Sequence, residues 1–283
     1  MNRRQFLRRL GMAAGGTALA AGGAYTYGRW IEPQWLSVEK VEVPVPNLPA
    51  PLDGLRIAQL TDFHLDPYYF VEFFEEVVAT TNRHRPDLVV HTGDFVSFKA
   101  GEIGEMTRIL APLNPPLGQV AVIGNHDITA GWKRVRAGLE AAGIRVLVND
   151  NLTLEQRGAG LMLAGVFSMY GFEVGMRPQL DRALAGWSPE VPTLLLAHEP
   201  AFADVASRDG RVALQLSGHT HGGQVRVPGY GPLWLPKYGR EYVEGLFAVG
   251  GMRQYTSRGL GCMDHPYRVW CPPELTLLTL RTA

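Results

Sequence analysis

The sequence has little cysteine, and nothing in it divides the chain into two halves. Only two cysteines occur among 283 residues, Cys262 and Cys271, and neither lies in a Cys-x-x-Cys or mixed Cys/His pattern. That absence argues against a structural zinc site. Because no Ser/Gly linker, charge run or internal repeat is present, we expect one domain after the N-terminal segment. Outside the cytoplasm the two cysteines could form a disulfide, and two separate thiols fit the spacing equally well.

The chain also lacks net charge, since 27 basic residues balance 27 acidic ones. No basic stripe is visible, so no nucleic acid is expected as a partner. The balance conceals an asymmetry, because residues 1–30 hold five arginines and no acid. This leaves 22 basic residues against 27 acids in residues 31–283, a formal charge of −5.

Residues 1–30 are typical of an export signal. A basic start is followed by an uncharged stretch, rich in glycine and alanine, from Leu10 to Gly28. The stretch RRQFLR, residues 3–8, resembles the twin-arginine signature, with Asn2 where serine or threonine is usual. We therefore expect the twin-arginine machinery to export the protein to the periplasm or the outer face of the cytoplasmic membrane. Residues 1–30 would be either cleaved after Ala18-Leu19-Ala20 or kept as a membrane anchor, with one domain over 31–283.

Short apolar runs alternate with helical patterns in the first part of that domain, and strands dominate its C-terminal third. This order predicts an α/β fold: a four-layer α/β/β/α sandwich of two mixed sheets, face to face and flanked by helices. An edge strand is expected over 35–46, with buried strands at 55–60, 87–91, 118–123, 160–167, 193–197, 212–217, 246–250 and 274–280. Helices are expected over 70–84, 102–110, 131–142 and 178–186.

Polar side chains follow five of these apolar runs. Since neighbouring loops converge at the carboxyl ends of parallel strands, a site is expected there. Each group alone has an ordinary explanation as a turn, a cap or a hydrogen-bonded histidine. Together, their carboxylate, amide and imidazole groups suit two adjacent first-row cations. An extended backbone would point His219 and His221 to the same side. The residues are Asp62, His64, Asp94, Asn125, His126, Asp127, His198, His219 and His221.

The motifs DFH, GD, GNHD, a later histidine and GHTHGGQ, in this order, resemble those of the calcineurin-like metallophosphoesterase superfamily. The segments LSGHTHGGQ, SRGLG and CPPE are similar to its exported bacterial branch, and the likeness covers residues 55–280. The resemblance implies that residues 31–283 are a metallophosphoesterase domain with a dinuclear site at the strand ends. Its two divalent ions would be manganese, iron or zinc.

The resemblance also implies a role for each matched residue. His126 would be the general acid, and Asp127 would orient it. Asp94 would bridge both metals, and a metal-bridging hydroxide would attack phosphorus. The resemblance assigns Asp62, His64 and His221 to one metal and Asn125, His198 and His219 to the other.

These inferences predict a metal-dependent phosphoesterase of the cell envelope that hydrolyses a phosphodiester or pyrophosphate bond. Its phosphoester substrate would be lipid- or nucleotide-linked, with membrane association as a further possibility. One alternative is a UDP-2,3-diacylglucosamine-type pyrophosphatase of lipid A synthesis. Alternatives of another class are a non-catalytic metal-binding envelope protein and a membrane-surface binding module.

A loop over residues 224–245, rich in aromatics, prolines and basic residues, directly follows the GHTHGG motif. It could wall the pocket, and an ordinary surface loop fits the composition equally well. Arg226, Lys237 and Arg240 are candidates to meet phosphate, and Trp234 and Tyr238 to meet an apolar or ring moiety.

Overall fold

Two six-stranded mixed sheets form the centre of the protein, whose computed structural model describes residues 2–66, 71–263 and 266–283. The first sheet has the order β1 (Ser37–Val45), β14 (Glu274–Thr282), β2 (Arg56–Leu60), β3 (Leu88–His91), β4 (Gln119–Ala121) and β5 (Arg145–Val146). The second has the order β12 (Gly245–Val249), β13 (Met252–Thr256), β9 (Leu214–Ser217), β8 (Thr193–Leu196), β7 (Ala159–Gly165) and β6 (Asp150–Gln156). A short pair, β10 (Arg226–Val227) and β11 (Gly231–Pro232), lies apart from both.

The central strands of both sheets run parallel, and this places their carboxyl ends together. In the first sheet β2, β3, β4 and β5 are parallel, while β14 is antiparallel to β2. In the second, β7, β8, β9 and β13 are parallel, while β6 and β12 are antiparallel additions. The pairing of Leu60 with His91 and of Leu196 with Leu216 keeps the ends of neighbouring strands within one residue of each other.

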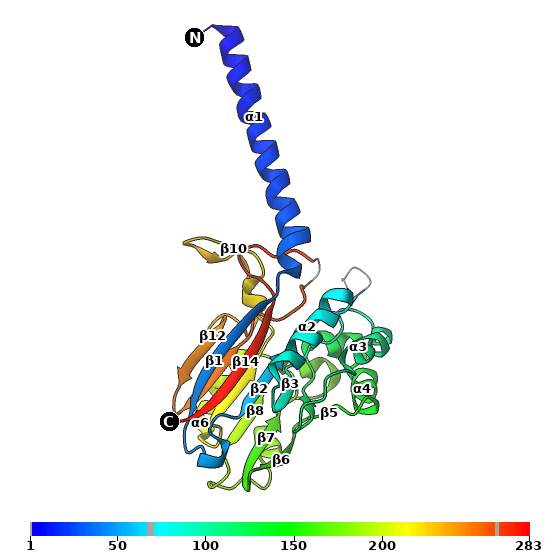
Figure 1. Ribbon diagram of the computed structural model, residues 1–283, viewed down its shortest axis with the longest axis vertical. Helices are drawn as coiled ribbons and strands as arrows, with labels where there is room; N and C mark the ends of the chain where they lie inside the picture. The colour runs from blue at the N-terminus through cyan, green and yellow to red at the C-terminus, as the bar shows by residue number, and fades with distance from the viewer. Residues whose placement is uncertain (1, 67–70, 264–265) are drawn as a thin grey trace.

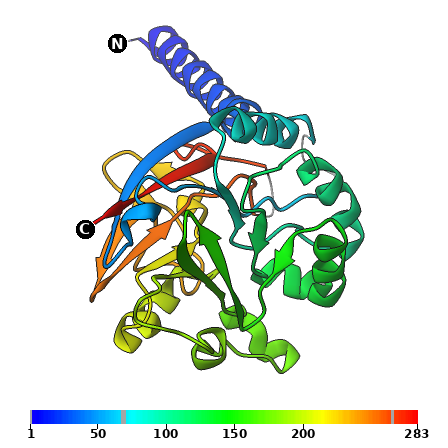
Figure 2. The same cartoon turned by 60° about the horizontal axis from the view of Figure 1, so that its bottom comes forward.

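Helices cover the outer face of each sheet (Figure 2). Apolar side chains of both sheets, such as Val90 and Leu194, form one cluster between them. The opposite faces pack against helices in two further clusters. The four-layer α/β/β/α prediction is therefore confirmed. The first sheet carries α2 (Val71–His84), α3 (Ile103–Leu110) and α4 (Asn125–Ala141), and the second carries α5 (Leu180–Ala183) and α6 (Ala203–Asp209).

Several predicted boundaries differ from the structure. The helix expected over 131–142 matches the second part of α4, because Gly131 breaks the helix with a non-helical φ of 117°. The first part, from Asn125, was not expected, and there the Asp127 carboxylate caps the first turn by accepting the backbone N–H of Gly124 at 3.0 Å. The helix expected over 178–186 is a single turn, α5, and Phe70, predicted to begin α2, lies outside the described residues. The sequence patterns also missed β6 and β13, the first of which has an alternating, half-exposed face.

The N-terminal residues form a long helix, α1 (Arg3–Thr26), that extends away from the sheets (Figure 1). Among the described helices, none combines the length and apolar content that a membrane crossing requires. The chain after α1 packs into the domain: the carbonyl of Gly28 accepts the N–H of Arg268 at 2.9 Å. The carboxylate of Glu32, only 1% exposed, accepts the N–H groups of Trp270 and Cys271.

Cys262 and Cys271 are buried free thiols. The structure therefore favours the second of the two alternatives left open by their spacing. The thiol of Cys271 donates to the carbonyl oxygen of His221 at 3.1 Å. Since Glu32 binds the N–H of Cys271, the segment after α1 is connected to a predicted metal ligand through two hydrogen bonds.

His91, buried at the end of β3, should make the protein less stable in acid. Burial lowers the pKa of its imidazole to about 4, against an ordinary value of 6.5. Below pH 6.5 His91 is protonated in the unfolded chain, whereas in the folded protein it stays neutral until about pH 4. Stability from this residue is therefore complete above pH 6.5 and falls by about 3 kcal/mol as the pH falls towards 4.

The measurement is urea unfolding of the parent and His91→Gln between pH 7 and 4.5, with chelator present throughout. The free energy of unfolding should fall less steeply with pH in the variant. Equal slopes in both proteins would contradict the assignment.

Candidate metal centre

The seven side chains predicted to bind metal lie together where strands of both sheets end. All except Asn125, which is half-buried, are 5% exposed or less. The structure thus brings residues from five separate segments to one point. Asp62 and His64 follow β2, Asp94 follows β3, Asn125 begins α4, His198 follows β8, and His219 and His221 follow β9.

One group of ligands consists of Asp62, His64 and His221. The Nε2 atoms of His64 and His221 lie 3.0 Å apart, and Asp62 Oδ1 lies 3.4 Å from His221 Nε2 and 4.0 Å from His64 Nε2. The Asp62 carboxylate is held from behind by the Thr61 hydroxyl at 2.7 Å and the N–H of His219 at 2.9 Å. Three donor atoms therefore converge at fixed positions.

The second group consists of Asp94, His198 and His219, with Asn125 beside them. Asp94 Oδ2 lies 3.1 Å from His198 Nε2 and 3.4 Å from His64 Nε2, so one oxygen faces both groups. Asn125 Oδ1 lies 3.0 Å from His198 Nε2. The Asp94 carboxylate thus lies where a carboxylate that bridges two metals is required.

Backbone carbonyls orient the imidazoles of the second group. His198 Nδ1 lies 2.7 Å from the carbonyl oxygen of Thr92, and His219 Nε2 lies 2.8 Å from that of Lys237. When these nitrogens donate their protons to the carbonyls, the other ring nitrogen presents its lone pair to the site. Such outer hydrogen bonds are usual for histidines that bind metals.

Left-handed backbone conformations direct most of these side chains inward. The φ angles of five of the seven residues lie between 49° and 70°, a region that costs a residue with a Cβ roughly 1–3 kcal/mol. His219 and His221 both belong to these five, so the segment is not extended. The expectation of an extended backbone was therefore wrong, although the two histidines do reach two neighbouring ligand groups, as expected. The five are Asp62, His64, Asp94, His219 and His221.

The electrostatics favour an anionic Asp94 and three neutral imidazoles. Burial lowers the pKa of His64 and His221 well below the ordinary value, and lowers that of His219 to about 3. Burial would raise the pKa of Asp94, but His198 and the other imidazoles outweigh it and hold this pKa well below the usual range. Burial would lower the pKa of His198, but Asp94 outweighs it and holds this pKa well above the ordinary value, while burial raises the pKa of Asp62 to about 6. The rings of His64, His219 and His221 thus keep lone pairs for a cation while Asp94 supplies negative charge.

The donor set fits two divalent cations. Ligands about 2.1 Å from one ion lie about 3.0–3.4 Å from each other, close to the spacings on both sides of Asp94. The donor atoms of Asp62, His64 and His221 all lie within 4.8 Å of one another, as do those of Asp94, His198 and His219. Two neutral imidazoles facing at 3.0 Å share one hydrogen bond at most, whereas a cation accepts both lone pairs. The chain therefore has the ligand groups of a dinuclear site.

His126 lies beside both ligand groups without belonging to either expected set. Its N–H donates to Asp94 Oδ1 at 2.8 Å, and its Nδ1 lies 3.2 Å from the carbonyl oxygen of Ser97. The ring meets that of His64 edge-on, with centroids 4.5 Å apart. A side chain fixed in this way, half-buried at the pocket, can deliver a proton there.

The resemblance implied that Asp127 would orient His126, but within the described residues the hydrogen bonds of its carboxylate go to backbone N–H groups and not to the His126 ring. Its carboxylate accepts the backbone N–H groups of Asp94 at 2.9 Å, Phe95 at 2.9 Å and Val96 at 3.3 Å, in addition to Gly124. The reason is geometric, since a side chain in the first turn of α4 faces the neighbouring loop. Asp127 therefore fixes the loop that carries Asp94.

Gly124 is required by this close packing. A Cβ at this position would overlap Asp94 Oδ1, whereas a Cβ at Gly251 would meet nothing within 4 Å. We expect Gly124→Ala to displace the Asp94 carboxylate and weaken divalent-metal binding about 10- to 100-fold, as for other residues that support ligands. Calorimetric titration with Mn²⁺ measures this effect, with Gly251→Ala as the matched control. Unchanged affinity in Gly124→Ala would contradict the position assigned to Asp94.

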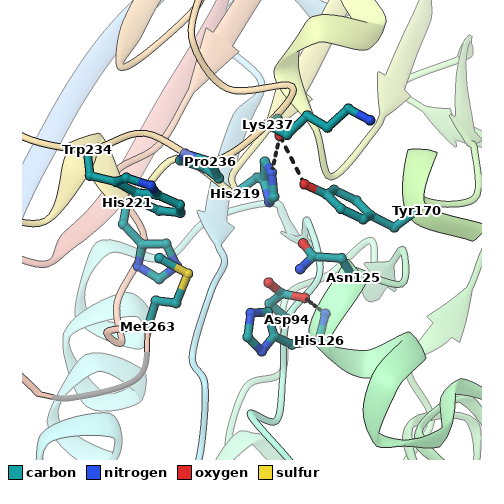
Figure 3. A pocket seen from close by; sticks show the side chains of 10 residues that line it. All are labelled: Asp94, Asn125, His126, Tyr170, His219, His221, Trp234, Pro236, Lys237 and Met263. Atoms are coloured by element: carbon teal, nitrogen blue, oxygen red, sulfur yellow. Dashed lines mark hydrogen bonds between the residues drawn. The ribbon is translucent and has the colours of Figure 1, made fainter.

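A cavity of about 260 Å³ opens over the ligands (Figure 3). Trp234 and Met263 lie on one side of it, and Tyr170 and Asn125 lie on the other. The sequence patterns missed three lining residues, Tyr170, Pro236 and Met263. Tyr170 donates to the carbonyl oxygen of Lys237 at 3.3 Å, which closes the rim between two distant segments. The metal ligands were predicted because they are polar residues that follow a strand, and none of these three residues fits that pattern.

Of the five substrate-binding candidates, Trp234 and Lys237 line this cavity. Lys237 does so through its backbone, while its ammonium lies 4.6 Å from the ring centroid of Tyr238. Arg226 does not reach the cavity, because an ion pair with Glu244 holds it in a separate hollow beside Tyr230 and Trp270.

The other two candidates, Tyr238 and Arg240, also lie outside the cavity. Tyr238 packs edge-on against Tyr170, with centroids 5.4 Å apart, behind the rim. The chain turns at Tyr238, whose φ is 69°, and Arg240 beyond the turn is exposed. The loop thus walls the pocket chiefly through Trp234 and Pro236 rather than through basic side chains.

The glycines of the SRGLG motif pack against the loop after β2. The N–H of Gly261 donates to the carbonyl oxygen of Asp62 at 2.6 Å, and that of Leu260 to Thr61 at 3.0 Å. A Cβ at Gly261 would overlap the carbonyl of Phe63. This part of the C-terminal motif therefore supports a metal ligand.

Several known proteins are similar to this chain in sequence. Residues 55–223, more than half of the chain, match the family model for calcineurin-like phosphoesterase. The chain is 36% identical to the uncharacterized metallophosphoesterase YkuE of Bacillus subtilis, over all of this chain and 98% of that protein. It is 30% identical to the phosphodiesterase YaeI of Escherichia coli over 99% of each chain.

A solved structure shows the same fold. The sulfate thiohydrolase SoxB of Thermus thermophilus superimposes with a TM-score of 0.50 at 16% identity, over 74% of this chain. The chain spans about half of that protein, 52% of its length. The likeness therefore bears on the arrangement of sheets and helices alone.

Proposed function

The chain belongs to the calcineurin-like phosphoesterase family and is a phosphoester hydrolase, and from this premise we propose that it cleaves a phosphodiester or pyrophosphate bond with two divalent metals. The observation that carries the proposal is the Asp94 carboxylate, which faces both ligand groups and lies next to His126. All these residues match the types expected at their positions, which supports catalysis over a purely metal-binding role.

In the proposed reaction the chain's own residues position the ligands and move one proton. Asp62, His64 and His221 would hold one cation, and Asn125, His198 and His219 the other, with Asp94 between them. When bound, the cations lower the pKa of water and neutralise phosphoryl oxygens. His126 protonates the leaving oxygen, and the buried surroundings of Asp94 exclude bulk water. Manganese, iron and zinc all suit this donor set.

The pocket walls support a substrate with a second substituent on phosphorus. Trp234, Pro236, Met263 and Tyr170 present apolar surface around the mouth. Lys237 is the one cationic residue among the described lining residues, apart from histidines, and its ammonium faces Tyr238. A dianionic monoester would gain little from such walls, whereas an apolar ester group can bury surface on them. The relative YaeI is itself named a phosphodiesterase.

The N-terminal sequence supports a role in the cell envelope. We propose export by the twin-arginine route, which transports folded proteins, to the periplasm or the outer face of the cytoplasmic membrane. The RRQFLR stretch and the absence of acids before residue 31 carry this proposal. Lipid- or nucleotide-linked phosphoesters are the substrates that such a location offers.

The test is hydrolysis by the purified full chain of bis(p-nitrophenyl) phosphate, p-nitrophenyl phosphate and a nucleoside diphosphate sugar. Each is measured with Mn²⁺, Fe²⁺, Zn²⁺ or chelator. Turnover of the diester or the pyrophosphate that needs metal, and exceeds that of the monoester, is the expected result. Metal-loaded, folded protein that hydrolyses none of the three, or prefers the monoester, would overturn the proposal.

A further inference from the structure

Large apolar side chains are exposed on three segments of the chain, one of which also lines the metal pocket. Six of them, between 49% and 77% exposed, come from three short segments of the chain. We call them the aromatic collar, because five of the six are aromatic: Trp30, Trp35, Tyr230, Leu233, Trp234 and Trp270. Four of the chain's six tryptophans are among them, and these four are exposed and do not belong to the hydrophobic core.

Hydrogen bonds join the three segments that carry the aromatic collar. The N–H of Val269 donates to Gln224 at 3.0 Å, and that of Arg226 donates back to Val269 at 2.9 Å. On the other side, Trp270 donates its N–H to the Glu32 carboxylate at 2.9 Å. The aromatic collar is therefore mounted on one connected framework, at the end of the molecule from which α1 extends (Figure 1).

Trp234 belongs both to the aromatic collar and to the pocket wall, where it lies on the same side as Met263 and His221 (Figure 3). Tyr230 and Trp270 line the separate hollow that holds Arg226. Because Trp234 belongs to both, a surface that contacts the aromatic collar also contacts the wall of the metal pocket.

The charges at this end differ from those of the rest of the domain. Residues 31–283 have a formal charge of −5, yet Lys237 and Arg240, just after Trp234, are both exposed. Arg29 lies with its guanidinium 4.0 Å from the ring centroid of Trp30. Of the two acids within residues 27–35 and 224–241, Glu32 is buried and only Glu241 is exposed.

More positive charge lies on α1, which leaves the domain from this end. Its arginines are exposed, and no acid occurs in the helix. An anionic surface would therefore attract this end and repel the remainder. The arginines are Arg3, Arg4, Arg8 and Arg9.

We propose that the aromatic collar docks on an anionic lipid bilayer and brings the mouth of the metal pocket to the level of the lipid headgroups. Tryptophan and tyrosine prefer this depth, because their rings are apolar and carry one polar group. Basic side chains near an anionic leaflet add attraction that salt weakens. The substrate consequence, a phosphoester presented from a lipid headgroup, rests on the proposed function. The docking itself does not.

The test compares the full chain with two triple variants in vesicle sedimentation. Tyr230→Ser/Leu233→Ser/Trp270→Ser removes half of the aromatic collar without touching the lining residue Trp234. Phe172→Ser/Val174→Ser/Val205→Ser is the matched control, since these residues are exposed on α6 and on the 3₁₀ turn before α5. Vesicles contain phosphatidylcholine, with or without phosphatidylglycerol, and chelator is present so that binding is measured without turnover.

The parent and the control should bind the vesicles with phosphatidylglycerol, and the collar variant should bind about tenfold more weakly or worse. Lipids brominated in the acyl chain should quench the tryptophan fluorescence of the parent more than that of the collar variant. Equal binding by all three proteins would overturn the proposal and assign membrane affinity to α1. A parent dimer in sedimentation velocity that the collar variant loses would overturn it in favour of a second copy, and absence of binding by the folded parent would overturn it outright.

Discussion

Asp94→Asn is expected to lower diester turnover by at least about 10³-fold while the protein stays folded. The Asp94 carboxylate lies 3.1 Å from His198 Nε2 and 3.4 Å from His64 Nε2, between the two ligand groups. An asparagine fills the same space but removes the negative charge that two neighbouring cations require. Removal of one hydrogen-bond donor from an oxyanion hole lowers kcat by about 10²–10³-fold in other enzymes. We expect a larger loss for Asp94→Asn, because it weakens the binding of both cations.

The matched control lies at the opposite end of the same strand. Asp87 directly precedes β3, and its carboxylate accepts the N–H of Arg56 at 2.8 Å, far from the pocket. Asp87→Asn should therefore keep turnover and bound metal. Metal content is measured by mass spectrometry after gel filtration, and thermal unfolding monitors the fold. Two tightly bound ions and normal turnover in Asp94→Asn would remove the bridging role.

The ligand set was predictable because its members follow apolar runs. Asp94 and His198 come soon after buried strands whose parallel arrangement the strand and helix pattern already indicated. Because neighbouring parallel strands end at the same edge of the sheet, residues that directly follow them lie close together at that edge. The resemblance then distributed them between two metals, and the structure brings Asp62, His64 and His221 together and places His198 and His219 beside Asp94.

The orientation of the ligands was not predictable in the same way. His219 and His221 were expected to project from an extended strand, but β9 ends at Ser217 and both residues have left-handed backbone. Local propensity disfavours that conformation for any residue with a Cβ. It persists here because tertiary contacts, such as the N–H of His219 on Asp62, hold the loop. Such contacts depend on residues more than 150 positions apart in the chain.

The substrate-binding residues could not be predicted from charge and residue type alone. Arg226 has the chemistry to meet phosphate, but Glu244, 18 residues later, pairs with it. Tyr170 and Met263 reach the cavity from segments that no motif connects. In contrast, Gly28 and Glu32 sit in a stretch whose composition indicated only an export signal and its end. Their burial against Arg268 and Cys271 becomes visible when the C-terminal loop is folded over them.

Replacement of His126 should give an effect whose size depends on the leaving group. We expect His126→Asn to slow hydrolysis of an alkyl phosphodiester by about 10²–10⁴-fold, because an alkoxide needs a proton as it departs. The same variant should cleave bis(p-nitrophenyl) phosphate almost as fast as the parent, since p-nitrophenolate is stable without a proton. The measurement is kcat for both substrates, with metal content determined in parallel.

The contrast between the two substrates separates a proton donor from a structural residue. His126 contacts the ligand Asp94 through its backbone N–H at 2.8 Å, which asparagine retains, so both metals should stay bound. His84→Asn, at the end of α2, is the control for histidine loss outside the pocket. A structural role for His126 predicts equal losses on both substrates together with lost metal. Only general acid catalysis makes the penalty grow with the basicity of the leaving oxygen, because the developing negative charge is what the proton neutralises.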